Sequence, residues 1–305
     1  MINPKFGRAT PEYVENIVYR NIGIKSSIGD RYVVIKQNYP KIILALGGGG
    51  ARGFAHIGVL QVLQEANIKL AGIVGTSMGA LIGSTFCAGT DLFYLARVLE
   101  ALGWENLIDL RIPQLGLIDG VKIKTLIDLL TKGKCFSDLE LNFWAVATDL
   151  HSGQEVVFKE GPLAPAIRAS ISIPGVFNPV EVNGRILVDG AVIAGVPVSI
   201  AKQMEGDLII AVNVGFDHTH HKINNVFDVL SKVMDIMGNR LDQFQMAVTD
   251  VSIVPQLGDI GTMHFHRANE CINIGRSATE KVIPDLLQKI KVFQEEQQKQ
   301  KDRVG

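Results

Sequence analysis

The sequence predicts an α/β fold with a mostly parallel sheet and helices on both faces. Short apolar runs alternate with segments in which apolar residues recur at helical spacing, and glycine-rich turns join the two. Strands that are separated by helices of this length pair in parallel. The chain has 305 residues, of which 47% are hydrophobic, and this is enough to bury a large core.

The first strands and helices follow one another closely. We expect a strand over 41–46, a helix over 56–67, a second strand over 70–75 and a helix through 79–89. Residues 70–90 form the longest run without a charge, but five glycines interrupt it and aromatic or basic flanks are missing. A buried strand, turn and helix therefore account for this run better than a membrane span does.

Further along the chain the same alternation continues after an irregular, partly helical stretch. Asp119 stands where it would cap a helix, and Asn183-Gly184 marks the tip of a hairpin over 177–190. The polar stretch 293–305 is typical of a fraying helix end. The remaining expected elements are strands over 142–150, 155–159 and 207–214 and helices over 163–172 and 197–204.

Composition excludes several classes of protein. A formal net charge of -1 argues against a dedicated nucleic-acid binder. Cys87, Cys135 and Cys271 are odd in number and form no C-x-x-C pair, which indicates neither a disulfide framework nor a zinc site and fits a reducing compartment. The N-terminus has no apolar core of a secretory signal. We therefore expect a cytoplasmic protein, with peripheral membrane association left open.

Two glycine motifs carry the chemistry. The loop after the first strand fits G-x-G-x-x-G through Gly48, Gly50 and Gly53, but the acid expected at the end of the next strand is missing, and no P-loop lysine follows. The next strand ends instead in G-x-S-x-G, residues 75–79, the setting of a nucleophilic serine. Ser77 is therefore the predicted nucleophile. Backbone N–H groups from Gly48 to Arg52, at a helix start, are suited to hold an oxyanion.

A nucleophilic serine needs a base, and no histidine stands in a specific setting. His56 is expected in the packing between helix and sheet, and His151 follows a strand end. The other histidines lie in polar or alternating segments: His218, His220, His221, His264 and His266. Asp189 is better placed, because a strand ends there and a glycine turn follows. Asp149 is the competing acid, although its place at a strand end favours a structural role.

Two arginines have two interpretations each. Arg52 either adds positive charge near the oxyanion or pairs with a carboxylate or a helix end. Arg168 either orients an anionic head group of the substrate or anchors the helix before Pro174, and we favour the anchor. With no metal or nucleotide motif left, we expect no cofactor and no metal ion.

Several ordered segments together resemble the patatin-like phospholipases, a family of bacterial-type lipid acyl hydrolases. They are "GGGGARG", "GTSMG", "ATDLHSGQEVVF", "IRASISIPGVFNPVEV" and "LVDGAV", with a weaker match in "DVSIVPQLGDIGTMHFHRANECINIG". The resemblance implies a three-layer α/β/α sandwich, hydrolysis of fatty acyl esters of lipids and a Ser77-Asp189 dyad without histidine. It also implies an oxyanion hole from Gly48, Gly49, Gly50 and Arg52. Gly47 and Gly195 depart from the family pattern, which often has Asp and Asn there.

The resemblance also sets the expected organisation. Residues 1–40 form an N-terminal extension, 41–202 the catalytic core, and 203–305 the C-terminal part of the same α/β domain. Residues 104–120 mix apolar side chains with few charges, as in a lid, a membrane-touching surface or a core. An ordinary aspartate, with a pKa near ~3.9, is a poor acceptor for the serine proton. Burial is one way to raise the basicity of Asp189, and proton transfer need only become favourable as the oxyanion forms, so we expect the oxyanion loop to lower more of the barrier.

Two other classes of function stay open. A dinucleotide-dependent enzyme would use the same Gly48-Gly50-Gly53 loop. A catalytically weak regulatory protein would keep this fold, because fold does not fix function.

Overall fold

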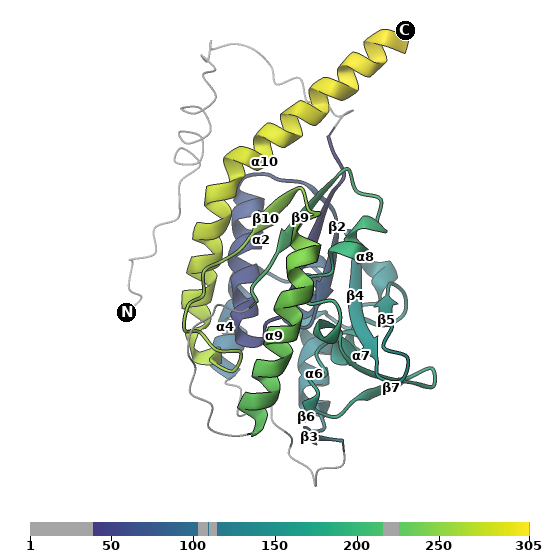
Figure 1. The fold of residues 1–305 in the computed structure, drawn as a ribbon, viewed down its shortest axis with the longest axis vertical. Coiled ribbons are helices and arrows are strands. Elements are labelled where there is room, and N and C mark those ends of the chain that lie inside the picture. Colours follow the sequence, from purple (N-terminus) through teal and green to yellow (C-terminus); the bar gives the residue numbers. More distant parts are fainter. Residues whose placement is uncertain (1–38, 103–108, 110–114, 216–225, 305) are drawn as a thin grey trace.

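A mostly parallel sheet forms the centre of the computed structural model, which describes residues 39–102, 109, 115–215 and 226–304 (Figure 1). Within these residues the sheet has eight strands. Seven follow the order β10 (Val251–Ile253), β9 (Leu208–Val212), β1 (Ile42–Leu46), β2 (Leu70–Thr76), β4 (Asn142–Asp149), β8 (Arg185–Asp189) and β7 (Val180–Val182). The pairs from β10 to β4 are parallel, whereas β8 and β7 run antiparallel to their neighbours.

Shorter strands complete the sheet structure. The eighth strand, β5 (Glu155–Phe158), pairs antiparallel with β4. A separate two-stranded sheet consists of β3 (Gly116–Ile118) and β6 (Gly175–Phe177). The hairpin between β7 and β8 turns at Asn183 and Gly184, whose φ angles of 52° and 74° confirm the predicted Asn-Gly turn.

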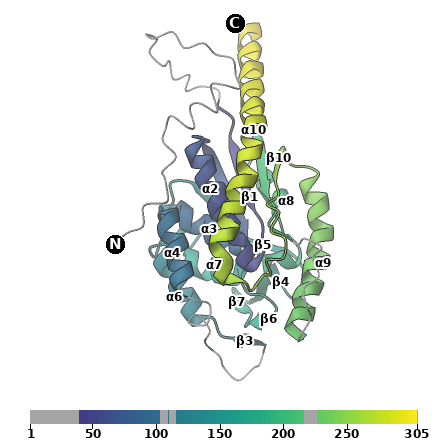
Figure 2. The same ribbon diagram turned by 90° about the vertical axis from the view of Figure 1, so that its left-hand side faces the viewer.

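Helices cover both faces of the sheet, as Figure 2 shows. Alternation along β1 sends Ile42, Leu44 and Leu46 to one apolar core and Ile43 and Ala45 to the other. The first core includes side chains of α2 (Ala55–Glu65), α3 (Met78–Cys87) and α10 (Ala268–Val304), and the second includes α8 (Val198–Lys202). The remaining helices are α4 (Leu92–Leu102), α6 (Val121–Leu130), α7 (Leu163–Ser170) and α9 (Val226–Met246). The predicted α/β/α architecture is thus confirmed.

The long helix α10 packs closely on α2. A side chain at Gly275 would collide with the backbone of Ala55, and one at Gly58 would collide with the backbone of Ile272. Glycine is needed at this crossing because the two backbones approach each other directly. The contact fixes α2, and with it the glycine loop that precedes α2 in the chain.

One predicted helix cap is wrong. Gly120, not Asp119, occupies the N-cap of α6, and no side chain of its own caps that helix. The carboxylate of Asp109 accepts the N–H groups of Gly120 and Val121, both at 2.8 Å. Asp119 accepts the side-chain N–H of Asn178 instead, at 3.1 Å. The capping carboxylate comes from a residue eleven positions upstream of the N-cap, whereas the capping rule considers only the N-cap residue and its neighbours.

Some of the sequence-based predictions concern residues that the structure does not describe. Residues 1–38, most of 104–120, and the histidines at 218, 220 and 221 lie outside the described ranges. Beyond residue 203, β9 and β10 extend the same sheet as β1. None of the helices in the described ranges combines the length and the apolar character needed to cross a bilayer.

Candidate active site

The sheet register brings Ser77 and Asp189 together. On β4, Val146 pairs with Thr76 of β2, and the next residue, Ala147, pairs with Asp189 of β8. The serine that follows β2 therefore meets the aspartate that ends β8. Its Oγ donates a hydrogen bond to Asp189 Oδ2 at 2.6 Å. Ser77 is 5% exposed and Asp189 only 1%, so water competes little for this contact.

The backbone at Ser77 is strained. Its φ of 53° and ψ of -122° lie in a region that residues with a side chain seldom adopt. The strain is held from both sides, because Ser77 N–H donates to Ser170 Oγ at 2.9 Å and Ser77 C=O accepts N–H groups from the first turn of α3. Such a turn lifts the serine Oγ off the end of the sheet, as the G-x-S-x-G pattern predicts.

Several hydrogen bonds fix Asp189. Its Oδ1 accepts the N–H of Ala191 at 2.8 Å, and its own N–H donates to Ser172 C=O at 2.9 Å. Burial raises the pKa of Asp189 to about 7, and the hydrogen bonds from Ser77 and Ala191 only partly oppose this shift. A carboxylate with this pKa is a far better proton acceptor than a solvated aspartate.

The glycine loop faces this pair. Gly48 lies so close that a side chain on it would touch Ser77 Cβ at 3.2 Å. The N–H of Gly48 donates to Gly195 C=O at 2.9 Å, and that of Arg52 donates to Gly49 C=O at 3.2 Å. The N–H groups of Gly49 and Gly50 have no backbone acceptor within the described part of the chain. Of the predicted oxyanion residues, these two have N–H groups that are not already engaged.

Arg52 forms an ion pair with α9. Its Nη2 lies 3.0 Å from Asp235 Oδ1, and its side chain is almost completely buried. This contact matches the interpretation of Arg52 as a partner of a carboxylate. The pair also connects the glycine loop to the helix on the far side of the cavity.

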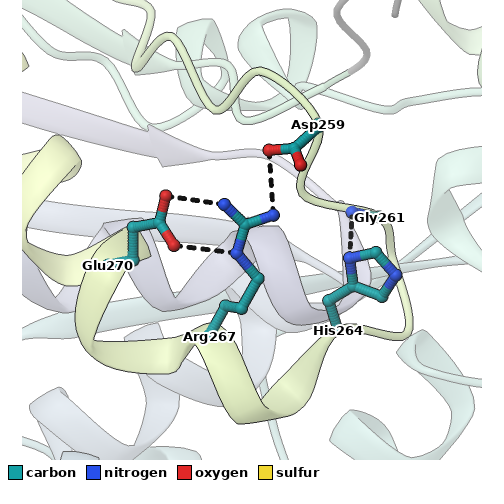
Figure 3. A network of polar contacts seen from close by, with 5 residues as sticks. All are labelled: Asp259, Gly261, His264, Arg267 and Glu270. Atoms are coloured by element: carbon teal, nitrogen blue, oxygen red, sulfur yellow. Dashed lines mark hydrogen bonds and ion pairs between the residues drawn. The ribbon is translucent and has the colours of Figure 1, made fainter. Parts of the chain in front are cut away.

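A loop near the start of α10 supports Gly50. Gly50 has φ of 54°, and a side chain there would collide with Thr262 C=O, which accepts the N–H of Ala51 at 2.8 Å. Arg267 holds this loop from below, with bonds of 2.9 Å to Asp259 and 2.7 and 2.8 Å to Glu270 (Figure 3). Nδ1 of His264 accepts the N–H of Gly261 at 3.0 Å. Thr262 therefore sits in a loop fixed at both ends.

His56 and His151, the two histidines weighed as bases, contact groups other than Ser77 and Asp189. His56 is fully buried, as predicted, and its Nε2 lies 2.7 Å from Gly47 O. Burial lowers the pKa of His56 to about 4, so the ring is neutral and Nε2–H donates to this carbonyl. His151 is exposed and gives its backbone N–H to Asp149 at 3.0 Å. This bond ties Asp149 to the turn after β4.

Arg168 anchors the end of α7. Its guanidinium donates to Ser172 Oγ at 2.6 Å and to the carbonyl groups of Asp119 and Asn178 at 2.9 and 3.1 Å. It is 4% exposed and lies over the ring of Phe177. The favoured structural interpretation therefore agrees with its contacts. Because Ser172 C=O holds Asp189, Arg168 also supports the dyad indirectly.

Two cavities meet at Ser77. The first is bounded by Ser77 and Asp189, the glycine loop and α9, and its lining mixes apolar side chains with polar ones such as Asp235 and Asp242. The second is apolar and runs from Ser77 between α3, α6 and Phe177. Within the described ranges, no group of three or more His, Cys, Asp or Glu side chains is placed to hold a metal ion.

Comparison with known proteins gives the family. The sequence model of the family "Patatin-like phospholipase" matches residues 44–202, slightly more than half of the chain. The chain belongs to the patatin-like phospholipase family. This finding confirms the resemblance noted from the sequence motifs, and all five of the strongest motifs lie inside the matched range.

Individual relatives extend the comparison. An uncharacterized NTE family protein of Mycobacterium tuberculosis is 41% identical over 177 residues, which cover 57% of this patatin-like chain and 49% of that protein. Patatin-like phospholipase domain-containing protein 7 of Mus musculus is 32% identical over 200 residues, which cover 62% of this chain and 15% of that protein. The chain therefore spans about half the length of the mycobacterial relatives that it matches.

A solved structure shares the fold. The crystal structure of VipD from Legionella pneumophila superimposes with a TM-score of 0.51 and 14% identity, covering 82% of this chain and 67% of VipD. At this identity the likeness concerns the fold.

Sequence reasoning did not identify the two serines at the end of α7. Ser170 Oγ holds the N–H of Ser77, and Ser172 C=O holds the N–H of Asp189. Both occur in "IRASISIPG", a segment with an ordinary helical pattern. The sequence carries no local signal for these roles, because Ser170 lies 93 residues from Ser77 along the chain.

Relief of the strain at Ser77 should be measurable. We expect Ser77→Gly to be more stable than Ser77→Ala by on the order of 1 kcal/mol, because only glycine adopts this φ and ψ without strain. Both variants lose the Oγ, so the comparison isolates the backbone. Urea denaturation of the two proteins measures the difference, and equal midpoints would contradict the assigned strain.

Proposed function

We propose that this protein is a serine acyl hydrolase that cleaves fatty acyl esters of lipids. The observation that carries the proposal is the buried hydrogen bond of 2.6 Å from Ser77 Oγ to Asp189 Oδ2, which lies beside the glycine loop. Family membership supports the same reaction class. Ser77 is the proposed nucleophile and Asp189 the proposed base.

In the first step, Ser77 Oγ attacks the carbonyl carbon of the ester and its proton passes to Asp189 Oδ2. The carbonyl oxygen becomes an oxyanion, which accepts the N–H groups of Gly49 and Gly50. Asp189 then gives the proton to the departing alcohol oxygen, and the C–O bond of the ester breaks. An acyl group remains on Ser77.

In the second step, water attacks the acyl-enzyme. Asp189 takes one proton from the water as its oxygen bonds to the carbonyl carbon, and the oxyanion returns to the same N–H groups. Collapse of the intermediate breaks the bond to Ser77 Oγ, which recovers the proton from Asp189. A free fatty acid leaves, and Ser77 and Asp189 return to their starting states. The proton exchanged between Ser77 and Asp189 moves along a hydrogen bond that is already formed.

The two cavities suggest how a substrate lies. The apolar cavity, lined by side chains such as Phe54, Leu81 and Leu126, suits an acyl chain. The other cavity at Ser77, whose lining includes the polar side chains of Asp235, Asn239 and Asp242, suits the alcohol part of the ester. An ester that spans both cavities has its carbonyl carbon at Ser77. This arrangement favours a lipid ester over a small polar one.

The roles of the dyad can be tested with a fluorophosphonate ester and p-nitrophenyl esters. Intact mass should show one adduct on the wild type and none on Ser77→Ala. Asp189→Asn should lower hydrolysis by about 100-fold to 10,000-fold, since it removes the proton acceptor. Asp149→Asn is the matched control, because Asp149 ends the neighbouring strand β4 and should be dispensable. Full activity of Asp189→Asn would exclude the proposed base.

Unfolding should not explain the loss in Asp189→Asn. Because burial raises the pKa of Asp189, the charged form is the less stable one in the folded protein. The stability that the neutral acid provides is present below pH ~4 and is lost as the pH rises through about 7. Thermal unfolding at pH 8 should therefore find the variant at least as stable as the wild type.

The pH dependence of turnover follows from the same pKa. Asp189 accepts the proton only as a carboxylate, so kcat/KM should rise with pH and level off above about 7. Below this value it should fall about tenfold per pH unit. Initial rates with a soluble p-nitrophenyl ester between pH 5 and 9 measure the profile. A flat profile from about pH 5 to 8 would contradict a base with this pKa.

The apolar cavity should set the preferred chain length. Leu126→Trp fills part of it, and the loss of burial for two methylenes is expected to lower kcat/KM for long esters about tenfold. Butyrate esters should be affected little. Leu129→Trp, on the same helix but 68% exposed, is the control. An equal effect on every chain length would place the acyl chain elsewhere.

A further inference from the structure

Helix α9 is attached to the rest of the protein by polar contacts. Asp235 pairs with Arg52 at 3.0 Å, and Asp242 Oδ1 accepts the N–H of Val196 at 2.8 Å. One turn further, Gln245 accepts the N–H of Ser199 at 3.0 Å. At about 100° per residue, these three positions lie on one face of the helix. That face is turned toward the sheet and the active-site cavity.

The opposite face of α9 is apolar and exposed. Its side chains are between 41% and 76% exposed, from Leu241 to Phe244. They are Val229, Leu230, Val233, Ile236, Met237, Leu241 and Phe244. An ordinary surface helix turns its apolar side inward and its polar side to water, so α9 has the reverse polarity.

This exposure is concentrated rather than scattered. Seventeen large apolar side chains are exposed in the described part of the chain, and seven of them lie in α9. Single exposed apolar residues are normal, but a contiguous patch marks a surface that contacts another apolar phase or molecule. Figure 1 shows α9 in front of the sheet, and Figure 2 shows the same helix at the right-hand margin of the described fold. Its outer face is therefore accessible.

The charges on α9 are divided in the same way. The acids Asp235 and Asp242 face the protein, whereas Arg240 is exposed and lies within the arc of the apolar side chains. A helix with a large exposed apolar face is typical of one that lies in the plane of a lipid surface. Arg240 adds one basic side chain to this face, and a basic side chain at a membrane attracts anionic head groups.

The position of α9 decides between possible occupants. Met234, Gly238 and Asn239 of the same helix line the cavity that contains Ser77 and Asp189. A lipid that is to reach Ser77 has to leave its aggregate and enter this cavity, which α9 borders. We propose that the outer face of α9 binds a lipid surface and holds the mouth of the active-site cavity against it.

The purpose of this lipid contact rests on the proposed hydrolase function, but the binding experiment does not require any hydrolysis. Ser77→Ala full-length protein, which leaves lipid intact, is floated with vesicles of phosphatidylcholine alone or mixed equally with phosphatidylglycerol. Met237→Ser with Phe244→Ser in that background should lower the partition coefficient roughly tenfold or more, because two large side chains lose their apolar contact. Binding should be stronger to the anionic vesicles. Phe93→Ser is the matched control, since Phe93 is 65% exposed on α4.

The same substitutions in protein with Ser77 intact separate the two proposals. Hydrolysis of p-nitrophenyl butyrate should be unchanged, whereas hydrolysis of vesicle lipid should fall together with vesicle binding. If no ester is cleaved but vesicle binding depends on Phe244, the surface stands and the hydrolase function fails.

Two results would overturn the surface proposal. One is vesicle binding that the α9 substitutions leave unchanged. The other is a dimer, found by analytical ultracentrifugation, that they dissociate without any effect on vesicle binding, because this face would then join two copies of the chain.

Discussion

The buried hydrogen bond between Ser77 and Asp189 is the constraint on which the rest of the site depends. A carboxylate removed from water is unfavourable when charged, and the serine beside it holds a strained backbone. Both features oppose folding, and in the proposed mechanism both increase reactivity. They persist because Ser170, Ser172 and Ala191 supply hydrogen bonds to the two residues. The surrounding core is large enough to bear this cost.

The end of α7 has an unusual share in that support. Within three residues it provides a hydroxyl for the N–H of Ser77 and a carbonyl for the N–H of Asp189. Arg168 fixes this turn, and burial lowers the pKa of its guanidinium to about 10, which still leaves it charged at neutral pH. Its guanidinium donates to one hydroxyl and two carbonyl groups, and these contacts hold the end of α7 in place. It therefore orients the dyad without entering the cavity.

Local signals in the sequence predicted every strand of the main sheet except β10, most helices, and the place of Ser77 and Asp189 at strand ends, but not the small sheet of β3 and β6. These signals are the apolar runs, the Asn183-Gly184 turn and the glycine motifs. Each determines the local structure of only a few neighbouring residues, so each can be recognised in the sequence. The Asp109 cap and the roles of Ser170 and Thr262 depend on contacts across many residues, which no local pattern encodes. Helix α9 was missed for a different reason. Its polar face is the inner one, so its periodicity points away from the core.

The reversed polarity of α9 has a physical cause in the site that it borders. Arg52 must lie near the glycine loop, and an unpaired cation there would favour the charged form of Asp189 and lower its pKa. Asp235 pairs with Arg52, and burial is the largest influence on the pKa of Asp189. Because the inner face of α9 carries the acids, the apolar residues of this helix lie on its outer face. The same helix therefore provides both the carboxylate that pairs with Arg52 near the dyad and the exposed apolar surface beside the cavity.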